Sequence, residues 1–264
     1  MNAIDKLSFF INEINDIKDT SLQEFAATLI VNADDYFFTV PASSSGKYHP
    51  YFAREENGLV KHTRCVVFYA MCNAESFDFN QHDKDLLIIS AIAHDIKKQG
   101  DGYKKHTVWE HPEFASNYVL DMQTKYPNLI SKNDAKKIAN AVLSHMGKWA
   151  HHDEFVKKKK KYPMPNNLFE QALQSADYNA SRTELTGFAF RDSENVKLPK
   201  NILNSFILNE KEIVGNHVFD FGKYKGKTIK EVNQFDRNYL EWMKGKVDFK
   251  YKTSREKVIA FLNK

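Results

Sequence analysis

Six histidine and aspartate residues in the middle of this sequence have side chains that can bind a metal ion. In chain order they are His62, His94, Asp95, His111, His145 and Asp177. Histidine nitrogens combined with carboxylate oxygens suit divalent ions such as Mn, Fe, Co, Ni or Zn. Any one of these residues alone on an amphipathic helix is more often an ordinary polar residue. The prediction of a metal centre therefore rests on the whole set.

The local sequence around two of these positions favours the metal role. Asp177 follows the core-like run Ala-Leu-Gln-Ser-Ala, where an unpaired buried carboxylate would be costly and a bound ion would offset that cost. His94 and Asp95 are adjacent, and neighbours on a helix point about 100° apart. One carboxylate between two ions, with separate histidines on either side, would satisfy that geometry.

The segments that carry these residues have apolar residues at helical spacing. We expect helices at residues 59–73, 83–97, 111–125, 133–149 and 167–182, preceded by two helices in residues 1–31 that break near Asp19 with Ser21 as a cap. Facing helices of a bundle build metal sites from such side chains. Because no segment between residues 59 and 182 has the pattern of a strand, we expect an all-α body.

The pattern changes after about residue 213. Residues 218–227 alternate in character and contain two glycines, which predicts two short strands around a turn. Thr228 and Glu231 form a capping-box pattern, and residues 237–244 and 254–263 have helical spacing. We therefore expect a body at residues 1–213 and a small α+β module at residues 214–264, so that the chain as a whole is mainly α.

Positive charge is concentrated in the second of these parts. Residues 217–264 contain ten Lys and two Arg against three Asp and three Glu, a charge of +6, whereas the whole chain carries +4. A tail of that charge could hold a polyanion such as nucleic acid, although a solvated basic face without a partner remains an equal alternative. Five consecutive lysines at residues 157–161, followed by prolines, indicate an exposed loop.

Several other classes of protein are excluded by the sequence. No apolar stretch approaches the roughly 18–20 residues of a membrane span, and the first residues do not resemble a secretory signal. We expect Cys65 and Cys72 to be buried, reduced thiols. No Ser-His-Asp order, nucleophilic cysteine, phosphate-binding glycine loop or dinucleotide fingerprint is present. These features predict a soluble protein of the cytoplasm.

The order and spacing of the six residues resemble those of the HD-domain metal-dependent phosphohydrolases. The resemblance covers about residues 40–185 and includes the local contexts as well as the spacing. The matching segments are Gly58-Leu-Val-Lys-His62, Ala93-His94-Asp95-Ile96, His111-Pro112-Glu113, Ser144-His145-Met146-Gly147 and Ala176-Asp177-Tyr178. The resemblance implies an HD-type helical bundle that binds divalent metal ions, expected to be two ions of Mn, Fe, Co, Ni or Mg.

The resemblance also implies roles for these residues. His62, His94 and Asp177 would hold one ion, His111 and His145 would hold the other, and Asp95 would bridge the two together with a catalytic water. Lys98 is the best candidate for a phosphate contact and joins Asp95 as a catalytic residue, with Lys47, His49 and Arg64 as further substrate-binding candidates. Arg182 is expected to be structural. One-metal members of the family use only the residues equivalent to His62, His94, Asp95 and Asp177.

Within the family, residues 47–50 followed by Gly58-Leu59 look most like the HD domains of certain bacterial 3′-to-5′ exoribonucleases. Those enzymes carry an OB-fold ahead of the HD domain, and this sequence shows none there. Met146 stands where that group often has a second histidine, and a thioether is a poor ligand for a hard divalent ion. His151 or His152 could replace it, although both are expected in the exposed loop before the lysine run.

The tail has a resemblance of its own, to the small C-terminal module of exodeoxyribonuclease X-like proteins and of various phage and bacterial proteins. It rests on Phe219-Asp-Phe-Gly-Lys-Tyr-Lys-Gly-Lys227 and on Tyr239 to Trp242. Lysines on the turn could meet phosphates, and Tyr224 and Trp242 could stack on bases. The alternative is that Tyr239 and Trp242 form the core of this small module.

Together these features predict a metal-dependent phosphohydrolase, either a phosphomonoesterase or a phosphodiesterase. A metal-activated water would attack a phosphoester of a nucleotide or of a single-stranded nucleic-acid end. Loops at residues 41–57 and 150–166 could close over a free nucleotide, whereas the basic tail and the lysine run would favour a nucleic-acid end. The alternative is a non-catalytic nucleic-acid-binding or regulatory protein built on an HD scaffold.

Overall fold

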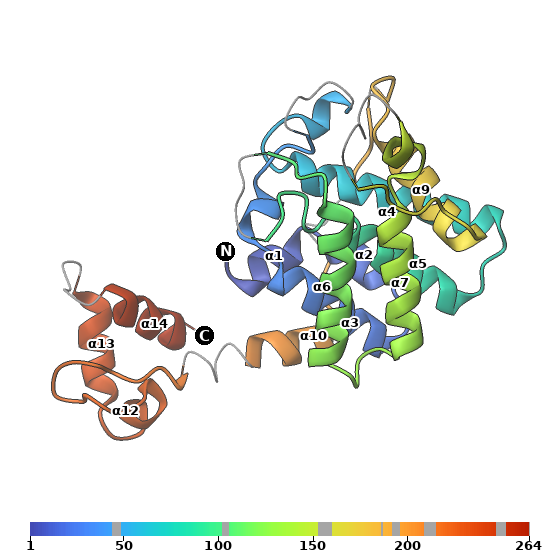
Figure 1. Cartoon of the computed structure of the whole chain (residues 1–264). Coiled ribbons are helices and arrows are strands. Elements are labelled where there is room, and N and C mark those ends of the chain that lie inside the picture. The colour runs from blue at the N-terminus through green and yellow to red at the C-terminus, as the bar shows by residue number, and fades with distance from the viewer. Residues whose placement is uncertain are drawn as a thin grey trace. The chain divides into compact units, whose positions relative to one another are not determined.

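A computed structural model of the protein describes residues 1–43, 49–101, 106–152, 160–185, 187–191, 196–208, 215–246 and 252–263. The chain divides into two compact units, Met1–Pro199 and Lys200–Lys264, and each is described by itself (Figure 1). The boundary at residues 213 and 214 that the sequence suggested stays a prediction.

The first unit is built mainly from helices. Its α-helices are α1 (Ala3–Ser8), α2 (Ile11–Asp16), α3 (Thr20–Asn32), α4 (Gly58–Ser76), α5 (Gln81–Ala93), α6 (His111–Lys125), α7 (Lys132–Ser144) and α9 (Leu168–Ala180), and its 3-10 turns are η1 (Asp35–Phe38), η2 (Tyr51–Ala53) and η3 (Gly147–His151). The expectation of a mainly helical body is confirmed. Within residues 1–31 there are three helices rather than two, and Asp19, not Ser21, caps α3 by accepting hydrogen bonds from the backbone of Ser21 and Leu22.

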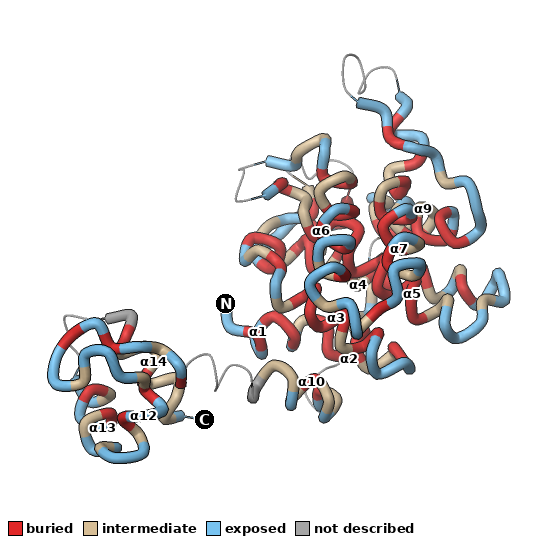
Figure 2. Tube along the Cα trace, turned by 60° about the horizontal axis from the view of Figure 1, so that its bottom comes forward, coloured by how far each residue is buried: buried red, intermediate tan, exposed pale blue. Residues whose placement is uncertain are grey.

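Helix α5 lies at the centre of this unit. It packs against α4, α7, α3 and α9, while α4 also packs on α9 and α6 packs on α7. Every residue of α5 from Asp85 to Ala93 is buried, as the red tube of Figure 2 shows for the interior of the unit. A helix that is apolar on all sides must be buried in this way. Any side chain at its carboxyl end is therefore delivered into the interior.

Two of the helices end earlier than their apolar spacing suggested. Helix α5 ends at Ala93 rather than near Lys97, and α7 ends at Ser144 rather than near Trp149. After α5 the chain continues in a tight turn, with the Lys98 amide donating to the Asp95 carbonyl at 2.9 Å. After α7, Gly147 adopts a left-handed φ of 52°, a conformation that favours glycine. Residues 94 and 145 therefore stand at helix ends.

The segment before α4 packs closely on the first turn of that helix. A Cβ atom at Gly58 would lie 2.3 Å from the Ala53 carbonyl oxygen and 3.1 Å from the Cα of Pro41, so only glycine allows this approach. The Leu59 amide donates to the Val40 carbonyl at 3.0 Å and the Ala42 amide to the Ala53 carbonyl at 2.9 Å. These contacts hold the chain around His49 beside the helix that carries His62.

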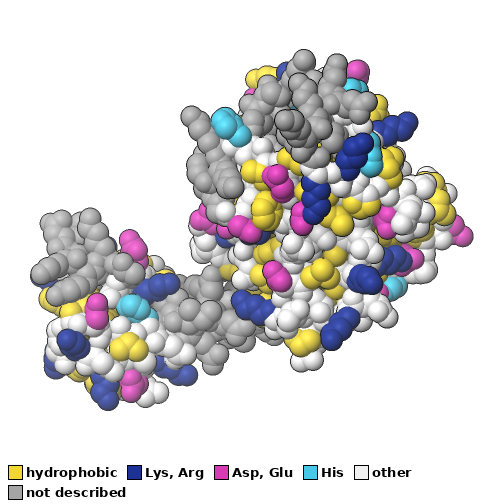
Figure 3. Space-filling model, viewed as in Figure 1, with side chains coloured by type: hydrophobic (Ala, Val, Ile, Leu, Met, Phe, Trp, Pro, Cys, Tyr) yellow, Lys and Arg dark blue, Asp and Glu magenta, His cyan; other side chains and the backbone are white. Residues whose placement is uncertain are grey.

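The second unit contains α10 (Lys200–Leu203), the π-helical turn η4 (Asn204–Leu208), α12 (Ile229–Phe235), α13 (Arg237–Gly245) and α14 (Lys252–Leu262). The capping box of Thr228 and Glu231 is present at the start of α12. The two predicted strands are wrong: in the described part of this unit the only strand pairing is a single bridge between Val218 and Thr228. Gly222 and Gly226 turn the chain at φ 65° and 85°, and α12 begins at Ile229 directly after the bridge, so in the described part of the tail no second strand follows along which a ladder could extend. On the face in Figure 3, Lys and Arg side chains are spread over the described surface of this unit.

Two further expectations concern single residues and membrane contact. Cys65 is buried and Cys72 is exposed, and both are free thiols, so the expectation that both would be buried is wrong for Cys72. Among the described residues, no helix is both long and apolar enough to cross a membrane.

Candidate metal centre

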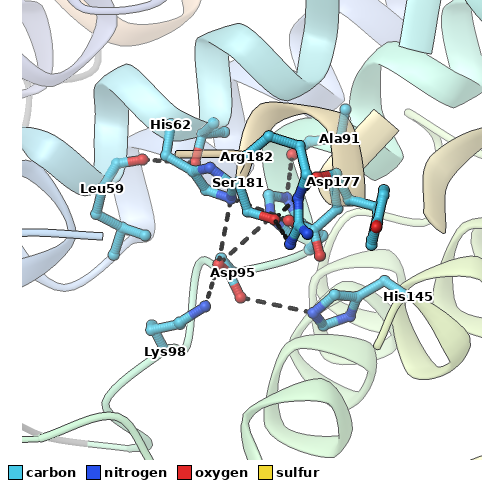
Figure 4. Close-up of polar contacts among 12 residues, drawn as sticks. Leu59, His62, Ala91, Asp95, Lys98, His145, Asp177, Ser181 and Arg182 are labelled. Atoms are coloured by element: carbon cyan, nitrogen blue, oxygen red, sulfur yellow. Dashed lines mark hydrogen bonds and ion pairs between the residues drawn. The ribbon is translucent and has the colours of Figure 1, made fainter. Parts of the chain in front are cut away.

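The six metal-binding side chains singled out in the sequence meet at one place in the helical body. His62 lies on the second turn of α4 and Asp177 on α9, His94 and His145 cap the carboxyl ends of α5 and α7, Asp95 follows His94, and His111 begins α6. They form two groups, His62 with His94 and Asp177, and Asp95 with His111 and His145. Within each group the ligand atoms all lie within 4.8 Å of one another. Figure 4 shows Asp95 between His62 and His145.

The two oxygens of the Asp95 carboxylate face different groups. Oδ2 lies 3.4 Å from His94 Nε2 and 3.8 Å from His62 Nε2. Oδ1 lies 3.2 Å from His111 Nε2 and 3.6 Å from His145 Nε2. Asp177 Oδ1 approaches the first group, at 3.1 Å from His62 Nε2 and 3.7 Å from His94 Nε2. Asp95 is thus placed to share one cation with each group.

Helix ends orient three of the histidine rings. Nδ1 of His94 lies 2.7 Å from the Ala91 carbonyl, and Nδ1 of His145 lies 2.6 Å from the Val142 carbonyl. The carbonyls of a helix's last turn have no partner within the helix, and because a carbonyl can only accept, each Nδ1 must carry the proton. Nδ1 of His111 pairs in the same way with the Val108 carbonyl at 2.8 Å. Such partners fix a ring so that its Nε2 faces the metal.

The donor atoms left by this arrangement fit a cation. With Nδ1 protonated, Nε2 of a neutral ring offers only a lone pair, yet His111 Nε2 and His145 Nε2 lie 3.3 Å apart. Nε2 of His62 and His94 and Oδ1 of Asp95 are buried and form no well-directed hydrogen bond with any described residue. Buried polar atoms without a partner are costly and rare. A divalent ion among them would satisfy these atoms.

The protonation states at the centre also suit a cation. Burial tends to raise the pKa of Asp95, but Lys98 and His94 hold it well below the usual range. Burial likewise opposes ionisation of Asp177, whose pKa the adjacent imidazole of His62 keeps low. His94 differs, because burial tends to lower its pKa but the carboxylates of Asp95 and Asp177 raise it, so a metal ion would have to displace its proton. Burial lowers the pKa of His62, and lowers that of His111 to about 4. Charged carboxylates and neutral imidazoles are the forms that bind metal.

A pocket of about 340 Å³ opens beside the centre. Its lining residues include His49, Lys98, Val108, Trp109, His111, His145, Met146, Trp149, Gln174, Asp177, Tyr178, Ser181 and Arg182. It combines apolar and aromatic walls with two cationic side chains. Met146, in place of the second histidine, is therefore part of the pocket wall. His151 is 2.7 Å from the Tyr162 carbonyl and His152 lies against Trp149, and neither joins the two ligand groups among the described residues.

The substrate-binding candidates have different positions. Lys98 lines the pocket and donates to Asp95 Oδ2 at 2.5 Å. His49 is buried with its ring 4.9 Å from the ring of His62, and burial lowers its pKa to about 3. Arg64 lies outside the pocket, because its Nε donates to Glu13 at 3.1 Å on the far side of α4. Lys47 lies outside the described residues.

Arg182 reaches the pocket although the sequence suggested a structural residue. Helix α9 ends at Ala180, and the chain then turns so that the Arg182 amide bonds to the Asn179 carbonyl. The guanidinium carbon lies 3.9 Å from the Tyr178 ring centroid, and Nε donates to the Tyr178 carbonyl at 3.1 Å. Figure 4 shows Arg182 next to Ser181 and near Asp177. A continuous helix would have turned it away from Asp177, so knowledge of the helix end was the missing signal.

A second cavity of about 560 Å³ adjoins the first. It is lined by Lys148, Trp149, His152, Met164, Pro165, Gln171, Gln174 and Tyr178. Trp149, Gln174 and Tyr178 line both cavities. The two cavities therefore border each other at these three residues.

The fold and the centre define a helical metal-binding protein with the ligand set of a hydrolase. More particularly, residues 59–181 match the family model of the HD domain, and residues 219–248 match that of the exodeoxyribonuclease X-like C-terminal domain. No curated protein and no solved structure matches the chain. The chain carries an HD domain followed by an exodeoxyribonuclease X-like C-terminal domain, which confirms both resemblances and points to a metal-dependent hydrolase.

Proposed function

We propose that this protein is a two-metal phosphohydrolase of the cytoplasm that cleaves a phosphoester bond in a nucleotide or at a nucleic-acid end. The placement of Asp95 carries the proposal. One of its oxygens faces His62 and His94, and the other faces His111 and His145. A carboxylate shared between two cations is the arrangement that in-line phosphoryl displacement uses.

The bound ions and the pocket side chains would have different roles at the reacting phosphorus. Bound divalent ions would supply an activated water and neutralise charge on the phosphoryl oxygens. In the structure Lys98 donates to Asp95 Oδ2. Because this oxygen would bind a cation, the hydrogen bond from Lys98 would be lost when metal binds. The ammonium of Lys98 would then turn into the pocket that it lines and meet a phosphate oxygen. Arg182, on the opposite wall, would hold a second oxygen of the same group.

The pocket supports a nucleotide unit as the substrate. Cationic Lys98 and Arg182 are suited to phosphate, and Trp109, Trp149 and Tyr178 offer aromatic faces to a base. The second cavity supports a nucleic-acid end, because a further nucleotide could pass between Trp149 and Tyr178. On this ground we favour a phosphodiesterase acting on a single-stranded end over a phosphomonoesterase.

Hydrolysis assays with added Mn(II) test the proposal. Substrates would be bis(p-nitrophenyl) phosphate, nucleoside monophosphates and end-labelled single-stranded DNA and RNA. We expect wild-type protein to shorten the labelled strands and Asp95→Ala protein to leave them intact. His82→Ala is the matched control, because His82 is an exposed histidine paired with Asp134, and it should retain full activity.

The alternative, a non-catalytic protein on an HD scaffold, makes the opposite prediction. It requires that wild-type protein turn over none of these substrates with Mn(II), Fe(II), Co(II), Ni(II) or Mg(II). It is compatible with nucleic-acid binding through the basic C-terminal module. Cleavage of mononucleotides alone would keep the hydrolase but replace the phosphodiesterase assignment with a phosphomonoesterase.

A further inference from the structure

Two large aromatic side chains of the second unit are exposed. Phe235 is 57% and Trp242 is 49% accessible. The core of this unit is formed without them, by Phe219, Phe221, Ile229, Val232, Leu240, Met243 and Val258. The alternative that Trp242 belongs to the core is therefore wrong, while Tyr239 packs at its margin. Exposed aromatic surface next to a complete core indicates a binding surface.

These two side chains are the ends of a row of four rings. The ring centroids of Phe235 and Tyr224 are 5.4 Å apart, those of Tyr224 and Tyr239 are 4.8 Å apart, and those of Tyr239 and Trp242 are 5.6 Å apart. Asp236 holds the row in place, because it accepts a hydrogen bond from the Tyr224 hydroxyl and one from the Tyr239 amide. We call these four residues the aromatic row.

Two lysines lie beside the aromatic row. The Lys223 ammonium lies 4.8 Å from the Tyr224 ring centroid, and that of Lys246 lies 5.5 Å from the Trp242 ring centroid. Lys225, Lys230 and Arg237 are exposed on the same small unit, and the face in Figure 3 shows several Lys and Arg side chains on its described surface. Since residues 217–264 carry a charge of +6, the partner of this surface should be an anion.

We propose that the aromatic row is a binding surface for single-stranded nucleic acid, on which unpaired bases stack while the lysines meet phosphates. Aromatic faces interleaved with basic side chains are the features that hold single strands without sequence preference. A duplex would offer its phosphates but no open base face. This surface deepens the proposed function by naming a second substrate contact, yet its binding needs no metal.

Fluorescence anisotropy of the full chain with labelled oligonucleotides tests the proposal. All proteins carry Asp95→Ala, so that no strand is cleaved. One probe is a thymidine oligonucleotide, and the other is an abasic strand of equal length that keeps the phosphates and lacks the bases. We expect tighter binding of the thymidine strand, and a loss of about tenfold for that strand on Trp242→Ala or Phe235→Ala. Both variants should bind the abasic strand as the parent does.

Salt dependence and a matched control separate stacking from charge and from misfolding. The aromatic variants should leave the slope of log affinity against log salt unchanged, whereas Lys225→Ala should reduce it by roughly 0.7 if Lys225 meets one phosphate. Val218→Ala removes another exposed apolar side chain of this unit, 49% accessible, and should bind like the parent.

Two outcomes would overturn the proposal. One is equal affinity for the thymidine and abasic strands, and the other is unchanged thymidine binding by Trp242→Ala and Phe235→Ala together. Preferred binding of a duplex would also contradict it and would assign the surface to backbone contacts. None of these results tests the hydrolase assignment. That assignment is tested separately, by nucleotide hydrolysis with a Trp242→Ala protein in which Asp95 is intact.

Discussion

At the scale of single residues, the account depends on the imidazole nitrogens of His111 and His145. Nε2 of His111 and of His145 face each other at 3.3 Å with their Nδ1 atoms bound to backbone carbonyls. This pair separates the two-metal arrangement from a one-metal site that uses only His62, His94, Asp95 and Asp177. It therefore yields the first prediction.

Replacing His111 with alanine should remove one of the two ions. The other group, His62 with His94 and Asp177, keeps all its ligand atoms, so metal content should fall by about one equivalent rather than to zero. Elemental analysis of His111→Ala beside His82→Ala makes the comparison. Unchanged metal content in His111→Ala would leave this histidine without a role in binding.

Arg182 gives a second prediction at this scale. It lines the pocket with its guanidinium against Tyr178, and a guanidinium has no lone pair to offer a metal ion. Arg182→Ala should raise KM by about tenfold through loss of a charged phosphate contact, with metal content unchanged. Steady-state kinetics on the cleaved substrate would measure this change in KM. A KM equal to that of wild type would show that Arg182 does not contact the substrate and is structural.

The ligand types and their grouping could be predicted from sequence, whereas the pocket could not. None of the six side chains is diagnostic alone, but their joint order and spacing along the chain made the set stand out. Arg182 and Trp149 owe their positions to helix ends at Ala180 and Ser144, and apolar spacing does not locate such ends. Arg64 was a substrate-binding candidate in the sequence but lies outside the pocket. Its ion pair with Glu13 joins segments far apart in the chain, and sequence spacing does not reveal such a contact.

At the scale of elements, the site depends on where helices begin and end. Ends of α5 and α7 place His94 and His145, and the start of α6 places His111. The first turn of α4 is held by the preceding segment, whose backbone leaves no room for a side chain at Gly58. Packing at this point should thus control the stability of the body.

Gly58→Ala should destabilise the protein by about 2 kcal/mol, because its Cβ would overlap the backbone oxygen of Ala53 and force the segment away. Urea unfolding followed by circular dichroism measures the free energy of unfolding. Gly187→Ala is the control, since a Cβ there meets none of the described atoms within 4 Å. Equal unfolding midpoints for the two variants would show that the contact is not as close as described.

The tail shows why strands are harder to predict than helices. Its alternating residues around Gly222 and Gly226 have the composition of a hairpin, yet they form only the Val218–Thr228 bridge. The pairing stays this short because α12 begins at Ile229, directly after the bridge, and no second strand follows it among the described residues. The capping box at Thr228, a local signal, was predicted correctly.

At the scale of the whole molecule, ligands from five helices would tie the body together through the bound ions. An ion that binds only the folded state stabilises it by mass action, by about 2.7 kcal/mol at one hundred times its Kd. Chelation followed by return of Mn(II) should therefore raise the thermal midpoint of the body by several degrees. Calorimetry of wild-type and Asp95→Ala protein measures this, and an equal rise in both would mean that Mn(II) acts elsewhere.

The most direct test of the account is the metal content of tag-free protein, measured by inductively coupled plasma mass spectrometry beside Asp95→Ala. Because Asp95 faces both ligand groups, the account predicts about two equivalents of divalent metal in the wild type and loss of bound metal in the variant. Wild-type protein that holds no metal, and takes up none when Mn(II) or Ni(II) is added, would contradict the hydrolase assignment.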